Sequence, residues 1–356
     1  MNPMPDFVHY PLAVNIAIFV AASAAVWIAG ARVVRYVDAI ADKTRIGQAF
    51  AGMLLLGGIT SLPEIAAVST ASGIGNAPLS ISNLLGSLMM NLVLLGIADA
   101  TFSRKAITSA VPGAATLLQG TLGIIALALL AGIIAVRDVP VVGVGIGSVV
   151  LFVFVVFAFW LSSRYARHNP WRADRSTARR KRRTERREPS PPVVTELERK
   201  SLAWLWSVTG AFGAIILIAG FALSETADAI SRETGLGSSF IGLVLVGFAT
   251  ALPNFSSIIG AVRLERFEMA ISDVFGANLF EIGLILLADA VFAGGPILNH
   301  AGRFEIVAAL LGIVLTAIYL MGLLEREDRT IFGLGYDSFA VLWVYFAGLV
   351  LLYFLA

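Results

Sequence analysis

A proline beside a carboxylate, inside an apolar stretch, is the first feature of the sequence that offers chemistry. Residues 57–64 read Gly-Gly-Ile-Thr-Ser-Leu-Pro-Glu. Pro63 has no N–H for the carbonyl four positions earlier, so a helix here is distorted and a carbonyl oxygen is freed. Thr60 and Glu64 lie four residues apart on one helix face, and Gly57 lets another backbone approach closely. Carbonyl, hydroxyl and carboxylate oxygens at one point outline a cation site.

A second copy of this pattern follows 190 residues later. Residues 250–254 read Thr-Ala-Leu-Pro-Asn and keep the threonine and the Leu-Pro pair. A lone proline in a membrane helix is usually a simple kink. A second proline in the same context makes a shared function the better interpretation.

A polar stripe lies on the apolar stretch after each proline. Its members are spaced by four residues and therefore share one helix face. They are Asn83, Ser87 and Asn91 in the first half, matched by Asp273, Ala277 and Glu281 in the second. Such side chains either bind ions or hold helices together, and for Asn83 and Ser87 both explanations stay open. For Glu281 the packing explanation is weaker, because a carboxylate within a membrane needs a hydrated cavity and a cationic or protonic partner.

The composition predicts the elements that position these residues. The chain of 356 residues is 58% hydrophobic and 14% charged, which excludes a water-soluble domain. Helices are expected rather than barrel strands, because the apolar stretches are about 20 residues long and do not alternate. The predicted fold class is therefore an all-α polytopic membrane protein with ten transmembrane helices. They are placed near residues 11–34, 47–72, 77–100, 107–136, 139–162, 201–223, 236–262, 269–292, 303–323 and 338–355.

An internal repeat organises the chain. Residues 46–100 align with residues 236–290 without a gap and are identical at 16 of 55 positions. The matches include the pairs Gly57 and Gly247, Thr60 and Thr250, Gly86 and Gly276, and Asp99 and Asp289. Five spans per copy is an odd number, so the second copy enters the membrane from the opposite side. The prediction is two inverted five-helix repeats, residues 1–163 and 201–356, a recurring plan of secondary transporters that bind their cargo near mid-membrane.

Residues 164–200 form the one long polar segment and join the two repeats. They hold 13 of the 26 Lys and Arg residues. Positive charge on a connector indicates the cytoplasmic side, which leaves both termini outside. We interpret the basic run as this topology signal, with contact to anionic lipid head groups as a secondary role and without nucleic-acid binding.

The two motifs together resemble those of the calcium/cation antiporter superfamily, which includes sodium/calcium and proton/calcium exchangers. Residues 60–64 match its first element, and residues 83–87 are similar to the second. The resemblance covers nearly the whole chain and both halves. It implies a cation site formed by Gly57, Thr60, Ser61, Glu64, Ser87, Asn91, Gly247, Thr250, Asn254 and Glu281. Asn83 and Asp273 are possible additional members.

The second half departs from the family pattern. Asn254 stands where the family places a second kinked-helix glutamate, and Ala251 and Ala277 replace hydroxyl ligands. Two carboxylates, Glu64 and Glu281, remain to balance a cation. They match one divalent ion, so exchange against two monovalent ions or two protons would move no net charge.

The expected function is a secondary active antiporter in the plasma membrane that exchanges Ca²⁺, or another divalent cation, against Na⁺ or H⁺ by alternating access. One alternative is a proton-coupled or monovalent-cation exchanger, since carboxylates in a dry cavity can take up protons near neutral pH. Another is a non-transporting relative that senses ions. Lipids and inorganic cations are the expected partners and no cofactor is expected. The sequence leaves the ions and the oligomeric state open.

Enzyme chemistry is not expected. The chain has no cysteine and three histidines, which leaves oxygen atoms as metal ligands. It shows no nucleophile with a convincing base, no His-Glu-x-x-His pattern and no nucleotide-binding loop.

Overall fold

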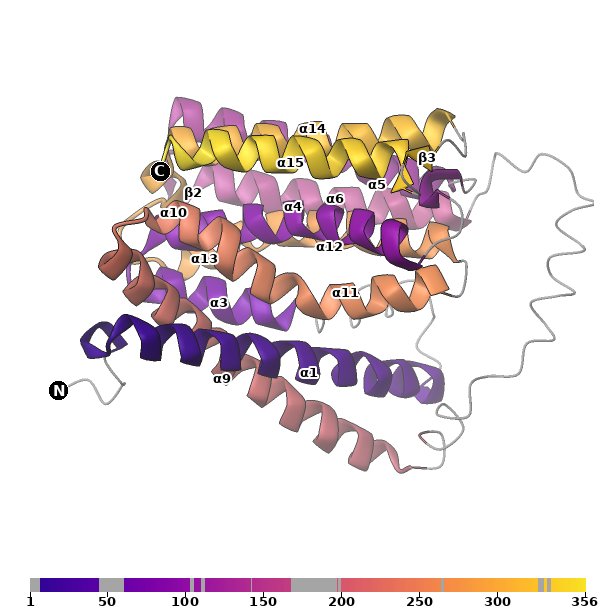
Figure 1. The fold of residues 1–356 in the computed structure, drawn as a ribbon, viewed down its shortest axis with the longest axis horizontal. Coiled ribbons are helices and arrows are strands. Elements are labelled where there is room, and N and C mark those ends of the chain that lie inside the picture. The colour runs from indigo at the N-terminus through magenta and orange to yellow at the C-terminus, as the bar shows by residue number, and fades with distance from the viewer. Residues whose placement is uncertain are drawn as a thin grey trace, which may run out of the picture.

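The protein is a bundle of long helices that run side by side (Figure 1). The computed structural model describes residues 7–44, 61–102, 106–109, 113–141, 143–167, 197, 200–263, 266–325, 330–331 and 334–356. Within these ranges nine segments are long and apolar enough to cross a membrane. The tenth expected span, near 47–72, is described only from Ser61 onwards. The prediction of an all-α polytopic membrane protein is confirmed.

The helices of the first half are α1 (Leu12–Thr44), α3 (Leu62–Gly73), α4 (Ala77–Phe102), α5 (Ala114–Val136) and α6 (Ile146–Arg167). Those of the second half are α9 (Leu202–Thr234), α10 (Ser238–Ile241), α11 (Gly247–Arg263), α12 (Phe267–Gly283), α13 (Ile285–Val291), α14 (Arg303–Glu325) and α15 (Tyr336–Tyr353). The turns hold η1 (Phe7–His9), η2 (Ile107–Ser109), η4 (Ile297–His300) and two hairpins, β1 (Pro140–Val141) with β2 (Val144–Gly145) and β3 (Thr330–Ile331) with β4 (Leu334–Gly335). A π-helical turn, η3 (Gly242–Val246), joins α10 to α11.

The described parts of the two halves correspond at the 190-residue offset seen in the sequence, with α12 and α13 together matching α4. Helices α1 and α9 are both 33 residues long and begin 190 positions apart. The two hairpins have the same register at the same offset. Glu233, near the end of α9, accepts a hydrogen bond of 3.1 Å from the backbone N–H of Leu12, at the start of α1. The two helices are therefore antiparallel, as inverted repeats require.

Helices α1 and α9 are each about ten residues longer than the apolar stretches that predicted them. The reason is that no glycine or proline interrupts the polar continuation of either stretch. Helix α9 ends only at Gly235, which has a left-handed φ of 72°. The span expected at 269–292 is in turn broken at Leu284, which separates α12 from α13.

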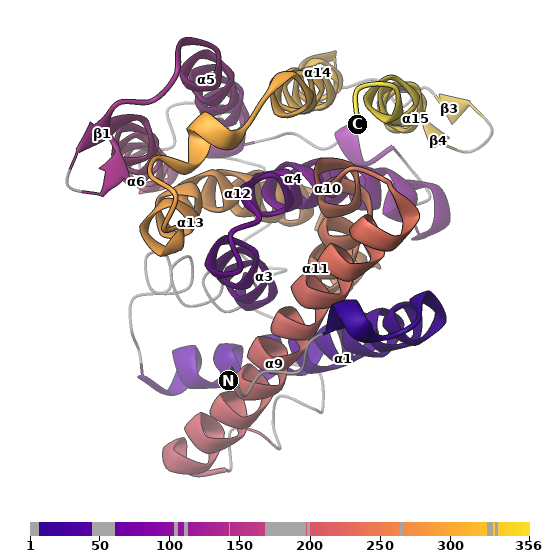
Figure 2. The same cartoon turned by 90° about the vertical axis from the view of Figure 1, so that its left-hand side faces the viewer.

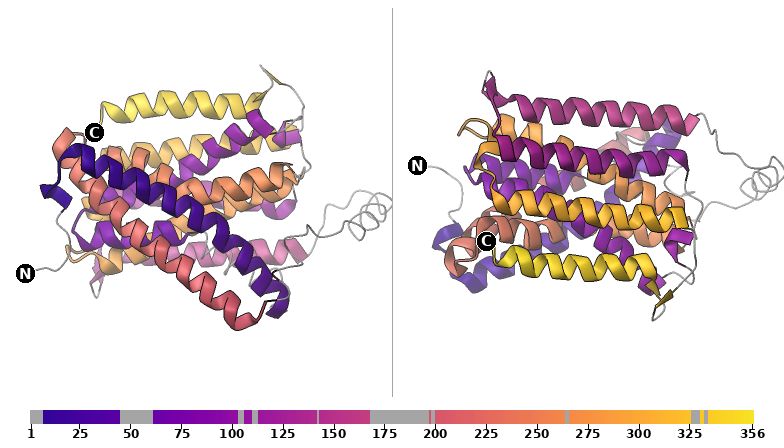
Figure 3. Two further views of the ribbon diagram at one scale, coloured as in Figure 1. Left: turned by 60° about the horizontal axis from the view of Figure 1, so that its bottom comes forward. Right: turned by 90° about the horizontal axis from the view of Figure 1, so that it is seen from above.

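The helices form three groups. Helices α6, α5, α14 and α15 lie in one layer in that order (Figure 3). Helices α4 and α12 lie beneath this layer, and α1 and α9 cross on the opposite side of the molecule (Figure 2). Almost every side chain of α4 from Leu79 to Leu95 is buried, so this helix is the centre of the core. Both the start of α1 and the end of α15 lie at one end of the bundle (Figure 1).

Glycines let α4 contact the α10–α11 span through the backbone. A Cβ on Gly86 would overlap the carbonyl oxygen of Leu243, and one on Gly247 would lie 2.6 Å from the Gly86 carbonyl carbon. Leu243 belongs to η3, and π-helical turns of this kind are frequent at functional sites. The close approach brings α11 and α4 near enough for short polar side chains to meet.

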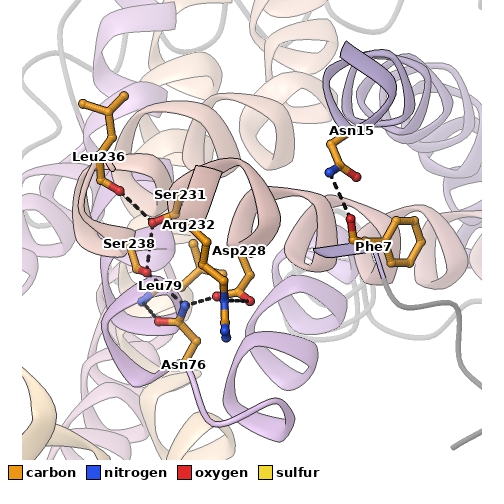
Figure 4. A network of polar contacts seen from close by, with 9 residues as sticks. All are labelled: Phe7, Asn15, Asn76, Leu79, Asp228, Ser231, Arg232, Leu236 and Ser238. Atoms are coloured by element: carbon orange, nitrogen blue, oxygen red, sulfur yellow. Dashed lines mark hydrogen bonds and ion pairs between the residues drawn. The ribbon is translucent and has the colours of Figure 1, made fainter. Parts of the chain in front are cut away.

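A polar network ties α4 to α9 and α10 at the end of the bundle where α1 begins (Figure 4). Asn76 Nδ2 donates to Asp228 Oδ1 at 2.6 Å and to Ser238 Oγ at 3.1 Å. Arg232 Nε pairs with Asp228 Oδ2 at 2.8 Å. The start of the central helix is thereby fixed to the second half of the chain.

Candidate cation site

Four helices place the predicted site residues in the interior of the bundle. The residues that meet there are Glu64 of α3, Ser87 and Asn91 of α4, Asn254 of α11, and Glu281 of α12. Pro63 and Glu64 occupy the first turn of α3 as described. A carboxylate at this helix end is stabilised by the positive end of the helix dipole.

Glu64 and Glu281 converge on one hydroxyl group. Ser87 Oγ lies 3.2 Å from Glu64 Oε1 and 2.9 Å from Glu281 Oε1. The two carboxylate oxygens are therefore at most 6.1 Å apart, and both side chains are fully buried. Two ionised carboxylates at that separation repel each other by about 3 kcal/mol at an effective dielectric constant of about 20. Among the described residues neither acid forms an ion pair with Lys or Arg, so a cation or a proton has to balance them.

A chain of amide groups connects α11 to this carboxylate pair. Asn254 Nδ2 donates to Asn91 Oδ1 at 3.1 Å. Asn91 Nδ2 in turn donates to Glu281 Oε1 at 3.0 Å and to Asn278 Oδ1 at 3.1 Å. The expected oxygen ligand Asn91 therefore has its oxygen engaged by Asn254 in this arrangement, and it acts as a hydrogen-bond donor to the acid.

Several buried polar atoms around the pair have no hydrogen-bond partner in the described structure. They are Ser61 Oγ, Glu64 Oε2, Asn83 Nδ2, Asn278 Nδ2 and Glu281 Oε2. Buried polar groups are normally satisfied, so such a cluster requires an explanation. The three oxygens in this set are ligands that a hard cation accepts. No group of three or more His, Cys, Asp or Glu side chains occurs in the described ranges, so a bound ion would depend on hydroxyl and amide oxygens as well.

Comparison with protein families identifies the family of this chain. The family model for the sodium/calcium exchanger protein matches residues 14–162 and 204–356, which are the two halves of the chain. The chain belongs to the sodium/calcium exchanger protein family. This exchanger is therefore a multi-pass membrane protein and a secondary active cation antiporter, as the sequence predicted.

Individual relatives agree with this assignment over most of their length. CaxA of Alkalimonas amylolytica is 26% identical over 307 residues, which are 82% of this chain and 86% of CaxA. The uncharacterized membrane protein MJ0091 of Methanocaldococcus jannaschii is 23% identical over 271 residues, 76% of this chain and 77% of that protein. Both alignments extend well beyond one repeat.

Solved structures share the fold of the exchanger. The H⁺/Ca²⁺ exchanger CAX has a TM-score of 0.67 at 13% identity and covers 98% of this chain and 87% of its own. The sodium-calcium exchanger NCX_Mj has a TM-score of 0.58 at 16% identity and covers 96% and 99%. At these identities the likeness establishes the architecture, and the ions remain to be argued from the site.

Other predicted site residues are buried on the same helices as the polar cluster or directly before them. Ser61 is buried directly before α3. The Thr250 hydroxyl lies 3.4 Å from both Asn83 Oδ1 and the carbonyl oxygen of Gly247. The kinked helix α11 and the polar stripe of α4 therefore face each other.

Three of the predicted residues have a different outcome. Asp273 lies on α12, two turns before Glu281. Its Oδ2 accepts a hydrogen bond of 2.6 Å from Ser257, so it is not joined to the carboxylate pair. Ser257 lies on α11, so Asp273 ties α12 to the kinked helix. Gly57 and Thr60 lie outside the described residues.

Asn278 is a member of the polar cluster that the sequence did not single out. It accepts a hydrogen bond from Asn91 and leaves its own Nδ2 without a partner. A sequence signal for Asn278 was present, since it is the last residue of the Gly-Ala-Asn sequence at residues 276–278. Its counterpart in the first repeat is Leu88, so a comparison of the repeats gave no reason to choose it.

Proposed function

We propose that this exchanger transports Ca²⁺, or another divalent cation, against Na⁺ or H⁺ through a site between Glu64 and Glu281. The observation that carries the proposal is the shared Ser87 hydroxyl, which holds one carboxylate from each inverted repeat at a single point. Alternating access opens such a site in turn to either side of the membrane. The proposed location is the plasma membrane, with residues 164–200 in the cytoplasm and both termini outside.

The ligand set proposed for the cation is Ser61, Glu64, Ser87 and Glu281, with Gly57, Thr60, Gly247, Thr250, Asn91 and Asn254 from the same two motifs. A calcium ion takes six to eight oxygens, of which two carboxylates supply the neutralising charge. The amide oxygen of Asn91 becomes available if its side chain turns away from Asn254. Binding then replaces an internal hydrogen bond by a metal–oxygen contact.

Charge counting predicts electroneutral exchange. Two carboxylates balance one divalent ion, or two monovalent ions or protons, so the loaded and returning forms of the site carry equal charge. We expect the equilibrium Ca²⁺ ratio across proteoliposome membranes to stay unchanged when a potential of about 100 mV is imposed. A cycle that moved one net charge would shift this ratio up to about 50-fold, because one charge across 100 mV is equivalent to about 2.3 kcal/mol.

The coupling ion is identified by imposing one gradient at a time. Vesicles containing purified exchanger are loaded with isotopic Ca²⁺ and diluted into sodium, potassium or pH gradients of equal size. Efflux driven by one gradient alone identifies the counter-ion. Vesicles without protein serve as the control for leakage. Absence of Ca²⁺ movement in all three gradients would overturn the proposed cargo.

Proton coupling is the second candidate, and the geometry of Ser87 favours it. A hydroxyl has one hydrogen, so it can donate to only one of the two carboxylate oxygens beside it. The other contact, at about 3 Å, is a hydrogen bond only when that carboxyl carries a proton and donates to Ser87 Oγ. The cation-free site thus has a place for one proton between Glu64 and Glu281, and electroneutral exchange against protons places a second proton on the other carboxyl group.

Proton release on cation binding tests this second candidate. Adding Ca²⁺ to purified exchanger in weakly buffered solution should acidify the medium, since a divalent ion displaces the shared proton. Acidification by Na⁺ or K⁺ and not by Ca²⁺ would indicate a monovalent-cation exchanger. Thermal stabilisation by ions without any flux in vesicles would indicate an ion-sensing relative that does not transport.

A further inference from the structure

Two buried aspartates, one near the end of α4 and one in α13 directly after α12, each bind the backbone of both repeats. Asp99, at the end of α4, accepts a 2.9 Å hydrogen bond from the N–H of Ile107 in its own repeat. Its other oxygen accepts a 3.1 Å bond from the N–H of Gly335, in the hairpin β3–β4 of the other repeat. The side chain is 3% exposed.

Asp289 makes the same pair of contacts from the opposite repeat. Its Oδ1 accepts a 2.7 Å bond from the N–H of Ile297, and its Oδ2 accepts a 2.7 Å bond from the N–H of Gly145 in the hairpin β1–β2. At the 190-residue offset Asp289 corresponds to Asp99, Ile297 corresponds to Ile107, and Gly145 corresponds to Gly335. The side chain of Asp289 is fully buried. We call these two sets of contacts the crossed clamps.

The crossed clamps join α4 and α13 to the last helix of the other repeat. Gly335 directly precedes α15, and Gly145 directly precedes α6. Helix α15 packs against α4, while α6 packs against α12 and α13. The two hairpins lie at opposite ends of the bundle (Figure 1). One clamp therefore acts at each end of the molecule.

We propose that Asp99 and Asp289 are positioning residues that set the axial register of α4 and α13, and through them the spacing of the site oxygens. The inference rests on the proposed site between Glu64 and Glu281. Asn91 precedes Asp99 by eight residues, and Glu281 precedes Asp289 by eight. At 1.5 Å per residue Asp99 is about 12 Å along α4 from Asn91, while Glu281 and Asp289 lie on the consecutive helices α12 and α13.

A carboxylate suits this role because each of its two oxygens accepts one backbone N–H. Such bonds to an ionised group are stronger than neutral ones and fix the direction of both donors. An asparagine at the same place keeps one acceptor and turns an NH₂ group towards the second donor. The hydrogen bond to one of the two repeats is then lost, while the volume of the side chain is retained. Supporting contacts behind metal ligands typically change affinity by about 10–100-fold.

Amide hydrogen exchange tests the crossed connection without any measurement of transport. We expect Asp99→Asn to raise exchange about tenfold at Gly335 as well as at Ile107, and Asp289→Asn to do so at Gly145 as well as at Ile297, because a neutral amide cannot hold both N–H donors at once. In each variant the effect reaches the hairpin of the other repeat. Asp138→Asn is the matched control, since the carboxylate of buried Asp138 accepts a 2.7 Å bond from the N–H of Gly147 in its own repeat. Its bonds to Asn299 of the other repeat are made by the Asp138 backbone, which the substitution leaves in place. Its effect should remain at Gly147.

Cation affinity distinguishes positioning from simple stabilisation. Asp99→Asn and Asp289→Asn should raise the KM for the transported cation about tenfold, whereas Asp138→Asn should lower the melting temperature and leave KM unchanged. Exchange that rises only within the substituted repeat would overturn the crossed connection. Crossed exchange with an unchanged KM would overturn the positioning role. Failure of the wild-type exchanger to transport any cation would instead overturn the proposed function, with the exchange pattern still readable.

Discussion

Removing either acid of the site, by Glu64→Gln or Glu281→Gln, should reduce cation uptake at least about 100-fold, because losing one partner of a buried charge costs about 3–5 kcal/mol. The two carboxylates supply all the charge that the described site offers to a divalent ion. Glutamine keeps the shape and one acceptor oxygen but leaves half of the ion's charge unbalanced. Initial rates of isotopic Ca²⁺ uptake into proteoliposomes measure the effect.

A third buried glutamate provides the control for these substitutions. Glu305, in the first turn of α14, is 2% exposed, and its carboxylate accepts hydrogen bonds from Ser82, Ser239 and the N–H of Gly302. Glu305→Gln removes one buried carboxylate from the bundle at a place outside the site. It should leave the KM for cations unchanged. Equal losses in all three variants would show that burial of charge, rather than cation binding, explains the phenotype.

The architecture was predictable because duplication leaves a signal that needs no tertiary information. The odd number of spans in each copy determined the relative orientation of the halves. The pair of Thr-x-Leu-Pro elements identified the two proline-containing helices before any helix was placed. Helix ends were less predictable, since hydrophobicity marks where a helix meets lipid and does not mark where hydrogen bonding stops. The polar ends of α1 and α9 show the difference.

Side-chain partners were predictable only where charge made them necessary. Glu64 and Glu281 had to find a polar environment in the membrane, and they share Ser87. Asp273 had the same need and satisfied it with a nearby hydroxyl, Ser257, which the periodicity of α12 cannot show. The identity of Asp99 with Asp289 was visible in the repeat alignment, but its reason depends on the contact that each aspartate makes with the hairpin of the other half.

The substitution Asn254→Asp should convert electroneutral exchange into exchange that responds to voltage. Asn254 Nδ2 now donates to Asn91 Oδ1, so an aspartate places an acceptor against an acceptor and turns the Asn91 amide round. The Asn91 N–H then leaves Glu281, and the site holds three carboxylates instead of two. Three monovalent ions or protons are needed to balance the returning form, against one divalent ion in the loaded form. The equilibrium Ca²⁺ ratio should therefore shift up to about 50-fold at an imposed potential of about 100 mV.

The comparison with Asn254→Gln separates charge from shape. Glutamine lengthens the side chain by one methylene but remains a neutral amide, so exchange in that variant should be slower and still independent of voltage. Voltage dependence in both variants would mean that the amide chain, and not the number of carboxylates, determines the charge moved. Voltage independence in an Asn254→Asp variant that still transports would mean that the third carboxyl group stays protonated throughout the cycle. In that case the charge carried per turnover is determined by Glu64 and Glu281 alone.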